Sequence, residues 1–260
     1  MEILVCGDLT LVCGDIHGRW GPLNTLINKE KPNIVLQCGD FGWWPHYHNQ
    51  KNFDGPKPWN QYGLKNKGTK VYWCPGNHEN WDDLERIEAS NNSGIYEIMD
   101  NVFYCSFGYI LTLPDKRKVL FVGGAESIDK DTRIIGNSWW HQEIITYADM
   151  DKLPDEKIDI VISHTLPFQM ACNAKGYQQY KWKIGDPSMK ALDIVFEKYK
   201  PSLWYAGHFH WHEETVYRNC LFTVLNMPGN WSKWWVKLKG DKYIMEDNIN
   251  GKIKKLYPTT

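Results

Sequence analysis

The sequence predicts an α/β fold in four layers, α-β-β-α, with two mixed sheets inside and helices on the outer faces. Short β-branched or apolar runs each end in a glycine or a turn followed by a polar residue, as buried strands do at their ends. Helix-length patterns separate several of these runs, which indicates a largely parallel sheet. From Glu213 onward the helical patterns stop and short alternating runs favour antiparallel strands.

The predicted strands follow one another along most of the chain. The runs before Glu213 read "ILVCGD", "LTLVCGD", "NIVLQCGD", "KVYWCPGN", "KVLFVGG", "DIVISH" and "SLWYAGH". Those after it read "EETVYR", "CLFTVLN", "KWWVKL" and "KYIMED". A helix is expected around Leu23, Leu26 and Ile27. Others are expected from Asn80 to Ala89, with Asn80 as N-cap, and from Pro187 to Tyr199, with Pro187 in the first turn.

We expect one domain over residues 1–260, because 42% hydrophobic content in a chain of this length can bury a sizeable core. It carries an aromatic-rich insert at about 41–66 and an antiparallel strand region at about 213–247. The insert includes Trp43 and Trp44 among Gly, Pro and Asn residues. It is either a substrate wall that stacks on a nucleobase or a small satellite core.

Composition restricts the function classes. The formal net charge of -1 does not indicate an obligate nucleic-acid binder with a basic surface. No apolar run approaches the ~20 residues of a membrane span, so no membrane partner is expected. The seven cysteines are an odd number without a C-x-x-C pair, which favours reduced thiols and a cytoplasmic protein.

The string Leu-Val-Cys-Gly-Asp occurs twice, starting at Leu4 and at Leu11. Only the second copy continues as Ile-His-Gly, so only Asp15 has an imidazole two residues later, that of His17. Gly7-Asp8 is a two-residue hairpin signal between apolar runs. We therefore expect Asp8 to be a turn residue and Asp15 to carry chemistry.

Five polar segments follow predicted strands, where loops held by a rigid sheet commonly carry catalytic groups. They are Gly14-Asp15-Ile16-His17-Gly18, Gly39-Asp40, Gly76-Asn77-His78-Glu79, Ser163-His164-Thr165 and Gly207-His208-Phe209-His210. In order and type they resemble the calcineurin-like metallophosphoesterase superfamily. The resemblance spans residues 11 to 210. The segment "GGAESIDKDTRIIGNSWW" resembles one found in its bacterial and phage members.

The resemblance implies a centre with two divalent metal ions, held by carboxylate, imidazole and amide groups without thiolate. The first metal would be held by Asp15, His17 and His210, the second by Asn77, His164 and His208, with Asp40 bridging the pair. Manganese is the expected ion, and the ligand set also suits Fe, Zn, Ni or Co. Hydroxide formed from a metal-activated water would attack the phosphate ester directly.

His78 matches the family's proton donor to the leaving oxygen. In the protein serine/threonine phosphatase branch the second motif continues as GDxVDRG, whereas this chain reads "GDFGWWPHYH". It therefore lacks the Asp that would orient His78 and an Arg that would clamp phosphate. Arg19 and Arg133 are the candidate replacements, because a guanidinium fork suits a phosphate; a surface salt bridge is the alternative for each.

The resemblance implies an enzyme that hydrolyses phosphate esters, and two function classes stay open. One is the di-metal phosphoesterase, acting on nucleotide or nucleic-acid phosphodiesters or, alternatively, on phosphomonoesters or phosphoproteins. The other is a catalytically silent metal-binding scaffold of the same fold. An intact His78 and a complete ligand set favour the enzyme.

Overall fold

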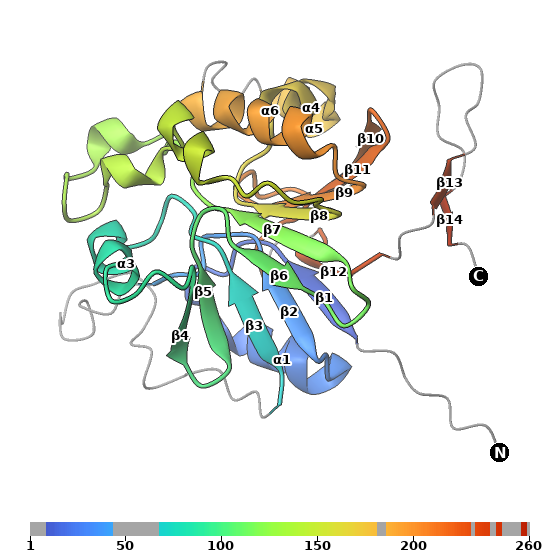
Figure 1. Ribbon diagram of the computed structural model, residues 1–260, viewed down its shortest axis with the longest axis horizontal. Coiled ribbons are helices and arrows are strands. Elements are labelled where there is room, and N and C mark those ends of the chain that lie inside the picture. The colour runs from blue at the N-terminus through green and yellow to red at the C-terminus, as the bar shows by residue number, and fades with distance from the viewer. Residues whose placement is uncertain are drawn as a thin grey trace.

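Two sheets lie face to face at the centre of the computed structural model, which describes residues 9–43, 68–180, 186–229, 232–239, 243–245 and 256–258 (Figure 1). The strand order of the first sheet is β12-β1-β2-β3-β5-β4. These strands are β12 (Trp235–Lys237), β1 (Thr10–Cys13), β2 (Ile34–Gln37), β3 (Lys70–Trp73), β5 (Val102–Cys105) and β4 (Ile95–Met99). Neighbours from β1 to β5 run parallel, and both edge strands are antiparallel.

The second sheet has the order β10-β11-β9-β8-β7-β6. Its strands are β10 (Glu213–Tyr217), β11 (Cys220–Val224), β9 (Leu203–Ala206), β8 (Ile160–Ser163), β7 (Lys118–Val122) and β6 (Ile110–Thr112). The four central strands are parallel and the two edges antiparallel, so both sheets are mixed as predicted. β13 (Tyr243–Met245) and β14 (Leu256–Pro258) pair with each other.

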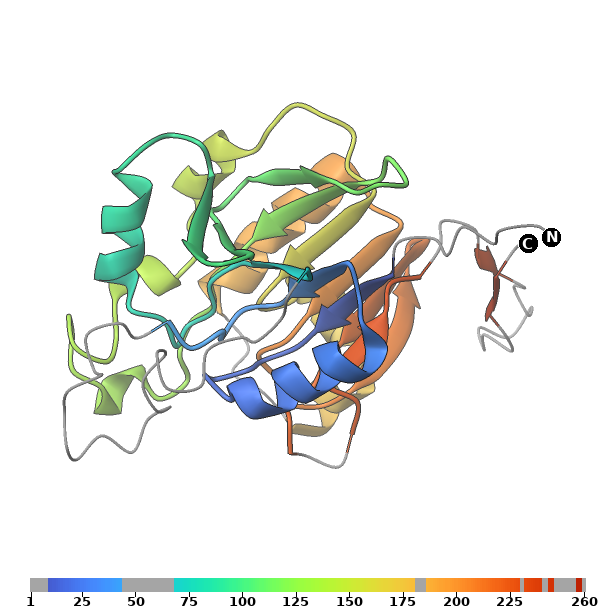
Figure 2. The same ribbon diagram turned by 90° about the horizontal axis from the view of Figure 1, so that it is seen from below.

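Helices cover the outer faces of both sheets. They are α1 (Trp20–Glu30), α3 (Trp81–Glu88), α4 (Phe168–Asn173), α5 (Lys175–Tyr180) and α6 (Pro187–Tyr199), with 3-10 turns η2 (Lys130–Thr132), η3 (His141–Glu143) and η4 (Tyr147–Lys152). The second sheet carries α4, α5 and α6, and α1 lies across the first sheet (Figures 1 and 2). The predicted four-layer α-β-β-α fold is confirmed.

Two helix starts follow the sequence signals. Asn80 caps α3, accepting a hydrogen bond on its side chain from the Asp83 amide at 3.2 Å. Asp186 caps α6 by accepting from the Ser188 amide at 2.8 Å, and Pro187 follows it. Both caps satisfy amide groups that the first helical turn leaves unpaired.

Three apolar layers result from the alternation of side chains along each strand. Val12 on β1 packs between the two sheets, whereas its neighbours Leu11 and Cys13 pack beneath α1. On β8, Ile162 lies between the sheets and Val161 packs against the helices of the other outer face. Both faces of the central strands are buried, which is why these runs read as continuously apolar.

The C-terminal strands do not form one antiparallel region. β10 and β11 belong to the second sheet, but β12 crosses to the edge of the first, where Lys237 pairs with Leu11. β11 is also parallel to β9. The hairpin expected at Gly7-Asp8 and all of the expected insert beyond Trp43 lie outside the described residues. No helix in the described ranges combines the length and the apolar composition needed to cross a bilayer.

Candidate functional site

Every predicted metal ligand lies just beyond the carboxyl end of a parallel strand. Three loops of the first sheet, after β1, β2 and β3, and two loops of the second sheet, after β8 and β9, contribute them. The residues are Asp15, His17, Asp40, Asn77, His164, His208 and His210. Because parallel strands end at the same edge of a sheet, the two packed sheets bring these loops together.

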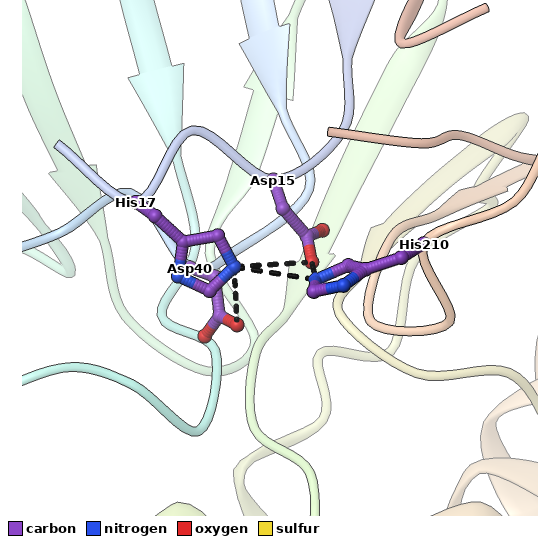
Figure 3. A group of neighbouring side chains, drawn as sticks. All are labelled: Asp15, His17, Asp40 and His210. Atoms are coloured by element: carbon purple, nitrogen blue, oxygen red, sulfur yellow. Dashed lines mark hydrogen bonds and ion pairs between the residues drawn. The ribbon is translucent and has the colours of Figure 1, made fainter. Parts of the chain in front are cut away.

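The first group comprises Asp15, His17, Asp40 and His210, whose potential ligand atoms all lie within 4.8 Å of one another (Figure 3). His210 Nε2 is 2.8 Å from Asp15 Oδ2. His17 Nε2 is 3.3 Å from His210 Nε2 and 3.5 Å from Asp40 Oδ2. This is the set predicted for the first metal, together with the predicted bridging carboxylate.

The second group surrounds the amide oxygen of Asn77. Asn77 Oδ1 lies 2.9 Å from His164 Nε2 and 3.0 Å from His208 Nδ1. His164 Nδ1 is 2.8 Å from the carbonyl oxygen of Cys38, so Nδ1 can donate to it and leave Nε2 as the ligand atom. Asp40 Oδ1 is 3.4 Å from His164 Nε2, which places Asp40 between the two groups.

The loops hold these side chains in an unusual backbone conformation. His17, Asp40, His208 and His210 have φ angles of 47°, 51°, 66° and 54°, in the left-handed region. Non-glycine residues occupy this region at an energetic cost, which the surrounding structure must sustain. Backbone amides also fix the carboxylates: that of His78 donates to Asp40 Oδ1 at 2.8 Å, and that of His208 to Asp15 Oδ1 at 2.9 Å.

Two glycines of the motifs are required by the close approach of the loops. A Cβ atom at Gly76 would overlap Asp40 Oδ1, and one at Gly207 would overlap Asp15 Oδ1. The Gly-Asn-His and Gly-His-x-His spacings therefore let the loops of β3 and β9 pass directly over the buried carboxylates.

The electrostatics of the site are dominated by burial and by mutual contact. Burial disfavours charge on Asp15 and Asp40, but the surrounding histidines keep the pKa of both carboxyls below its usual range. Burial also opposes charge on His164, yet Asp40 and Asp15 outweigh it and raise its pKa to about 10. Burial, followed by the nearby His164, lowers the pKa of His208 to about 3. Asp15 and Asp40 therefore favour a positive charge beside them.

The donor set fits a divalent cation. It offers two carboxylates, four imidazoles and one amide oxygen, the hard and borderline ligands that Mn, Fe, Zn, Ni and Co share. Asp15 Oδ2 is buried and accepts no well-formed hydrogen bond, although His210 Nε2 is only 2.8 Å away. A buried carboxylate oxygen without a well-formed hydrogen bond, next to further ligand atoms, fits a metal ion.

His78 lies beside the first group, with its ring edge-on to His17 at a centroid separation of 5.2 Å. Arg133 Nη2 is 2.8 Å from His78 Nε2 and 2.8 Å from Asp129 Oδ1, and Nη1 is 3.4 Å from the carbonyl oxygen of Asn77. Burial, assisted by the Arg133 charge, lowers the pKa of His78 to about 4 against the opposing effect of Asp40.

The remaining predicted substrate contacts are Arg19, Trp43 and Trp44. Arg19 donates through Nη1 to the carbonyl oxygen of Pro228 at 2.9 Å. Trp43 donates through Nε1 to Asp83 Oδ2 at 2.7 Å and packs against the core beneath α1. Trp44 lies outside the described residues.

Glu79 does not orient His78, although it is the next residue. Its carboxylate accepts from the amides of Gly42 at 2.8 Å and Gly76 at 2.5 Å, which joins the loops after β2 and β3. Burial, with a contribution from Asp40, raises its pKa to about 7. The imidazole of His78 instead contacts the guanidinium of Arg133.

Ser127 contacts the site and was not singled out from the sequence. Its Oγ lies 3.0 Å from Asn77 Nδ2, and its amide donates to Glu143 Oε1 at 2.8 Å. The one available signal was the segment "GGAES", which follows β7 as the ligand motifs follow their own strands. A lone serine there carries no ligand spacing, so only the folded geometry reveals its contact.

Comparison with known proteins identifies relatives at the level of the family. The profile of the calcineurin-like phosphoesterases matches residues 2–212. No curated protein matches the chain. Among solved structures, TT1561 of Thermus thermophilus is 12% identical with a TM-score of 0.48, covering 85% of this chain and 89% of its own. Phosphopantetheinyl Hydrolase (PptH) from Mycobacterium tuberculosis is 14% identical with a TM-score of 0.46, covering 89% of this chain and 96% of its own.

Proposed function

The chain belongs to the calcineurin-like phosphoesterase family and is a hydrolase of phosphate ester bonds, and from this premise we propose that it cleaves nucleotide or nucleic-acid phosphodiesters with two divalent metal ions. The position of Asp40 is the main observation in support of two metal ions. Its two carboxylate oxygens lie 3.5 Å from His17 Nε2 and 3.4 Å from His164 Nε2, one in each ligand group.

Under this proposal Asp15, His17 and His210 hold one ion, Asn77, His164 and His208 hold the other, and Asp40 serves both. Divalent ions would supply Lewis acidity, which neutralises phosphate charge and lowers the pKa of a water. Manganese is the ion we propose first, with Fe, Zn, Ni and Co as alternatives that the same ligands accept.

Arg133 is the residue we propose for binding the phosphate. Its side chain is 9% exposed and is held by Asp129, so its guanidinium is already directed at the site. A phosphate oxygen that took the Nη2 donor would compete with His78 Nε2 for it. His78 Nε2 would then be free to carry a proton to the leaving oxygen. Arg19, bonded to Pro228, is the weaker candidate.

Two observations bear on the substrate class. Trp43 has its indole N–H bonded to Asp83 and packs on the core, which supports a packing role for Trp43. A wall that stacks on a nucleobase would therefore depend on Trp44 and the other aromatic residues of the insert. Arg133 places a guanidinium charge beside the proposed metal ions. This additional positive charge suits the dianion of a phosphomonoester, so monoester hydrolysis is the second candidate.

A panel of mono- and diesters tests the proposal with the Mn²⁺-loaded protein. We expect diesters to be cleaved with a higher kcat/KM than monoesters, and Asp15→Asn to abolish both reactions. The reverse order would favour the monoesterase. Full metal occupancy without turnover on any ester would favour the silent scaffold.

We also propose a cytoplasmic site of action, because the cysteines in the described ranges are all free thiols.

A further inference from the structure

The side-chain amide of Asn77 presents different atoms to its two sides. Oδ1 is directed at His164 Nε2 and His208 Nδ1, at 2.9 and 3.0 Å. Nδ2 donates to Ser127 Oγ at 3.0 Å. Only the oxygen of an amide binds a metal, so turning the group over would replace a ligand atom with an NH₂ group.

Ser127 is itself held rigidly. It is 1% exposed, and its amide donates to Glu143 Oε1 at 2.8 Å. The same oxygen accepts from Trp139 Nε1 at 2.8 Å, and the Glu143 carbonyl accepts from the amide of Ala125 at 2.8 Å. Glu143 is fully buried at the end of η3. Main-chain and side-chain bonds together fix the loop after β7 against this turn.

We propose that Ser127 is a positioning residue for the second metal. Its hydroxyl determines which end of the Asn77 amide, the oxygen or the nitrogen, meets the ion, and Glu143 holds the Ser127 main chain in place. The inference rests on the proposed two-metal centre. Its physical basis is that Asn77 is 4% exposed, so water does not replace a lost partner of Nδ2. Partners of this kind orient metal ligands and commonly affect affinity by about 10–100-fold.

The test is a calorimetric titration of the metal-free protein with Mn²⁺. Ser127→Ala is expected to weaken the second binding event by about 10–100-fold and to leave the first within about threefold. Ser188→Ala is the matched control. Ser188 is also fully buried and accepts one amide hydrogen bond, from Ile145 at 3.0 Å, but at the start of α6. This control should leave both affinities unchanged.

The same Ser127 substitution in an Asn77→Asp protein tests the orienting role of Ser127 by itself. In Asn77→Asp both oxygen atoms of residue 77 can bind the ion, so the orientation no longer needs to be chosen. Adding Ser127→Ala to Asn77→Asp should therefore change the second affinity by no more than about threefold. Should Ser127→Ala fail to fold, Glu143→Ala tests the same link and should weaken only the second event.

The outcomes separate this inference from the proposed function. Equal losses in the Asn and Asp backgrounds, or no loss from Ser127→Ala or Glu143→Ala, would overturn the positioning role while leaving the two-metal centre intact. A wild-type titration without a second binding event would overturn both. Circular dichroism of each metal-free variant shows whether it is folded.

Discussion

At the scale of single residues, Arg133 connects the groups on which the proposed chemistry depends. Its guanidinium touches His78 and the carbonyl oxygen of Asn77, and Asp129 balances its charge. A lysine has one ammonium group and could not make these contacts in the same plane. The chain lacks the GDxVDRG motif, and in this chain Arg133 is the residue that lies beside His78.

His78→Ala should keep both metals and lose about 10²–10⁴-fold in kcat on an alkyl ester. The loss on an activated aryl ester should be much smaller, because a nitrophenolate leaves without protonation. His164→Ala, which removes a ligand, should lose a metal and fail on both esters. Measurements of metal content and of kcat on the two esters distinguish a proton donor from a metal ligand. A metal-depleted His78 variant, or equal losses on both esters, would contradict the proton-donor role.

Glu143→Gln should change how stability depends on pH. Burial raises the pKa of Glu143 from 4.5 to about 7. The folded state therefore binds more protons than the unfolded state between these values, and stability falls as pH rises through the window. Glutamine stays neutral, so the variant should gain up to about 3 kcal/mol relative to wild type between about pH 5 and pH 8. Urea unfolding in the presence of EDTA measures the difference in the free energy of unfolding between the two proteins. A difference that does not change with pH would contradict the effect of burial.

At the scale of elements, the loops that follow the strands pack closely around the buried carboxylates of Asp15 and Asp40. Four ligands have positive φ angles, and Gly207 lies so close to Asp15 that a side chain does not fit. The strands that lead into these loops, β1, β2 and β9, are buried and paired, so they can sustain this strain. The precision of the site therefore comes from the sheets.

Gly207→Ala should displace Asp15 and weaken binding of Mn²⁺ by the first ligand group by at least about tenfold, since positioning of a ligand is worth about that much. Gly21→Ala in α1 is the matched control, because a Cβ atom there meets nothing within 4 Å. The control should keep full metal affinity and be about 0.5–1 kcal/mol more stable. Equal metal affinity in both variants would show that the close approach has no role.

The sequence predicted the strands that carry the site because each is an apolar run that ends in a polar motif. It also predicted the start of α3 at Asn80 and of α6 at Pro187 closely, since capping is a local property. It could not predict that β12 pairs with β1, or that Ser127 meets Asn77, 50 residues away. Those contacts depend on which sheets pack together, and no local spacing encodes that.

At the scale of the whole molecule, the site joins the two sheets. Asp15, Asp40 and Asn77 come from the first sheet, and His164 and His208 from the second. Apolar packing between their inner faces also holds the two sheets together. A metal bound between them should stabilise only the folded state, because the ligands are far apart in the unfolded chain.

Saturating Mn²⁺ should therefore raise the Tm. At about 100 times Kd one site adds about 2.7 kcal/mol, which corresponds to a shift of roughly 5–10 °C for a chain of this size. EDTA should reverse the shift. The Asp40→Asn variant should show a smaller one, since Asp40 lies between both groups. A Tm that does not respond to Mn²⁺ would mean that these residues do not bind it.

The most direct test of the two-metal centre is an anomalous difference map from crystals soaked in Mn²⁺. The account predicts two peaks roughly 3.5–4 Å apart. One should lie among Asp15, His17 and His210 and the other beside Asn77, with Asp40 between them. A single peak, or peaks away from these residues, would contradict the two-metal assignment.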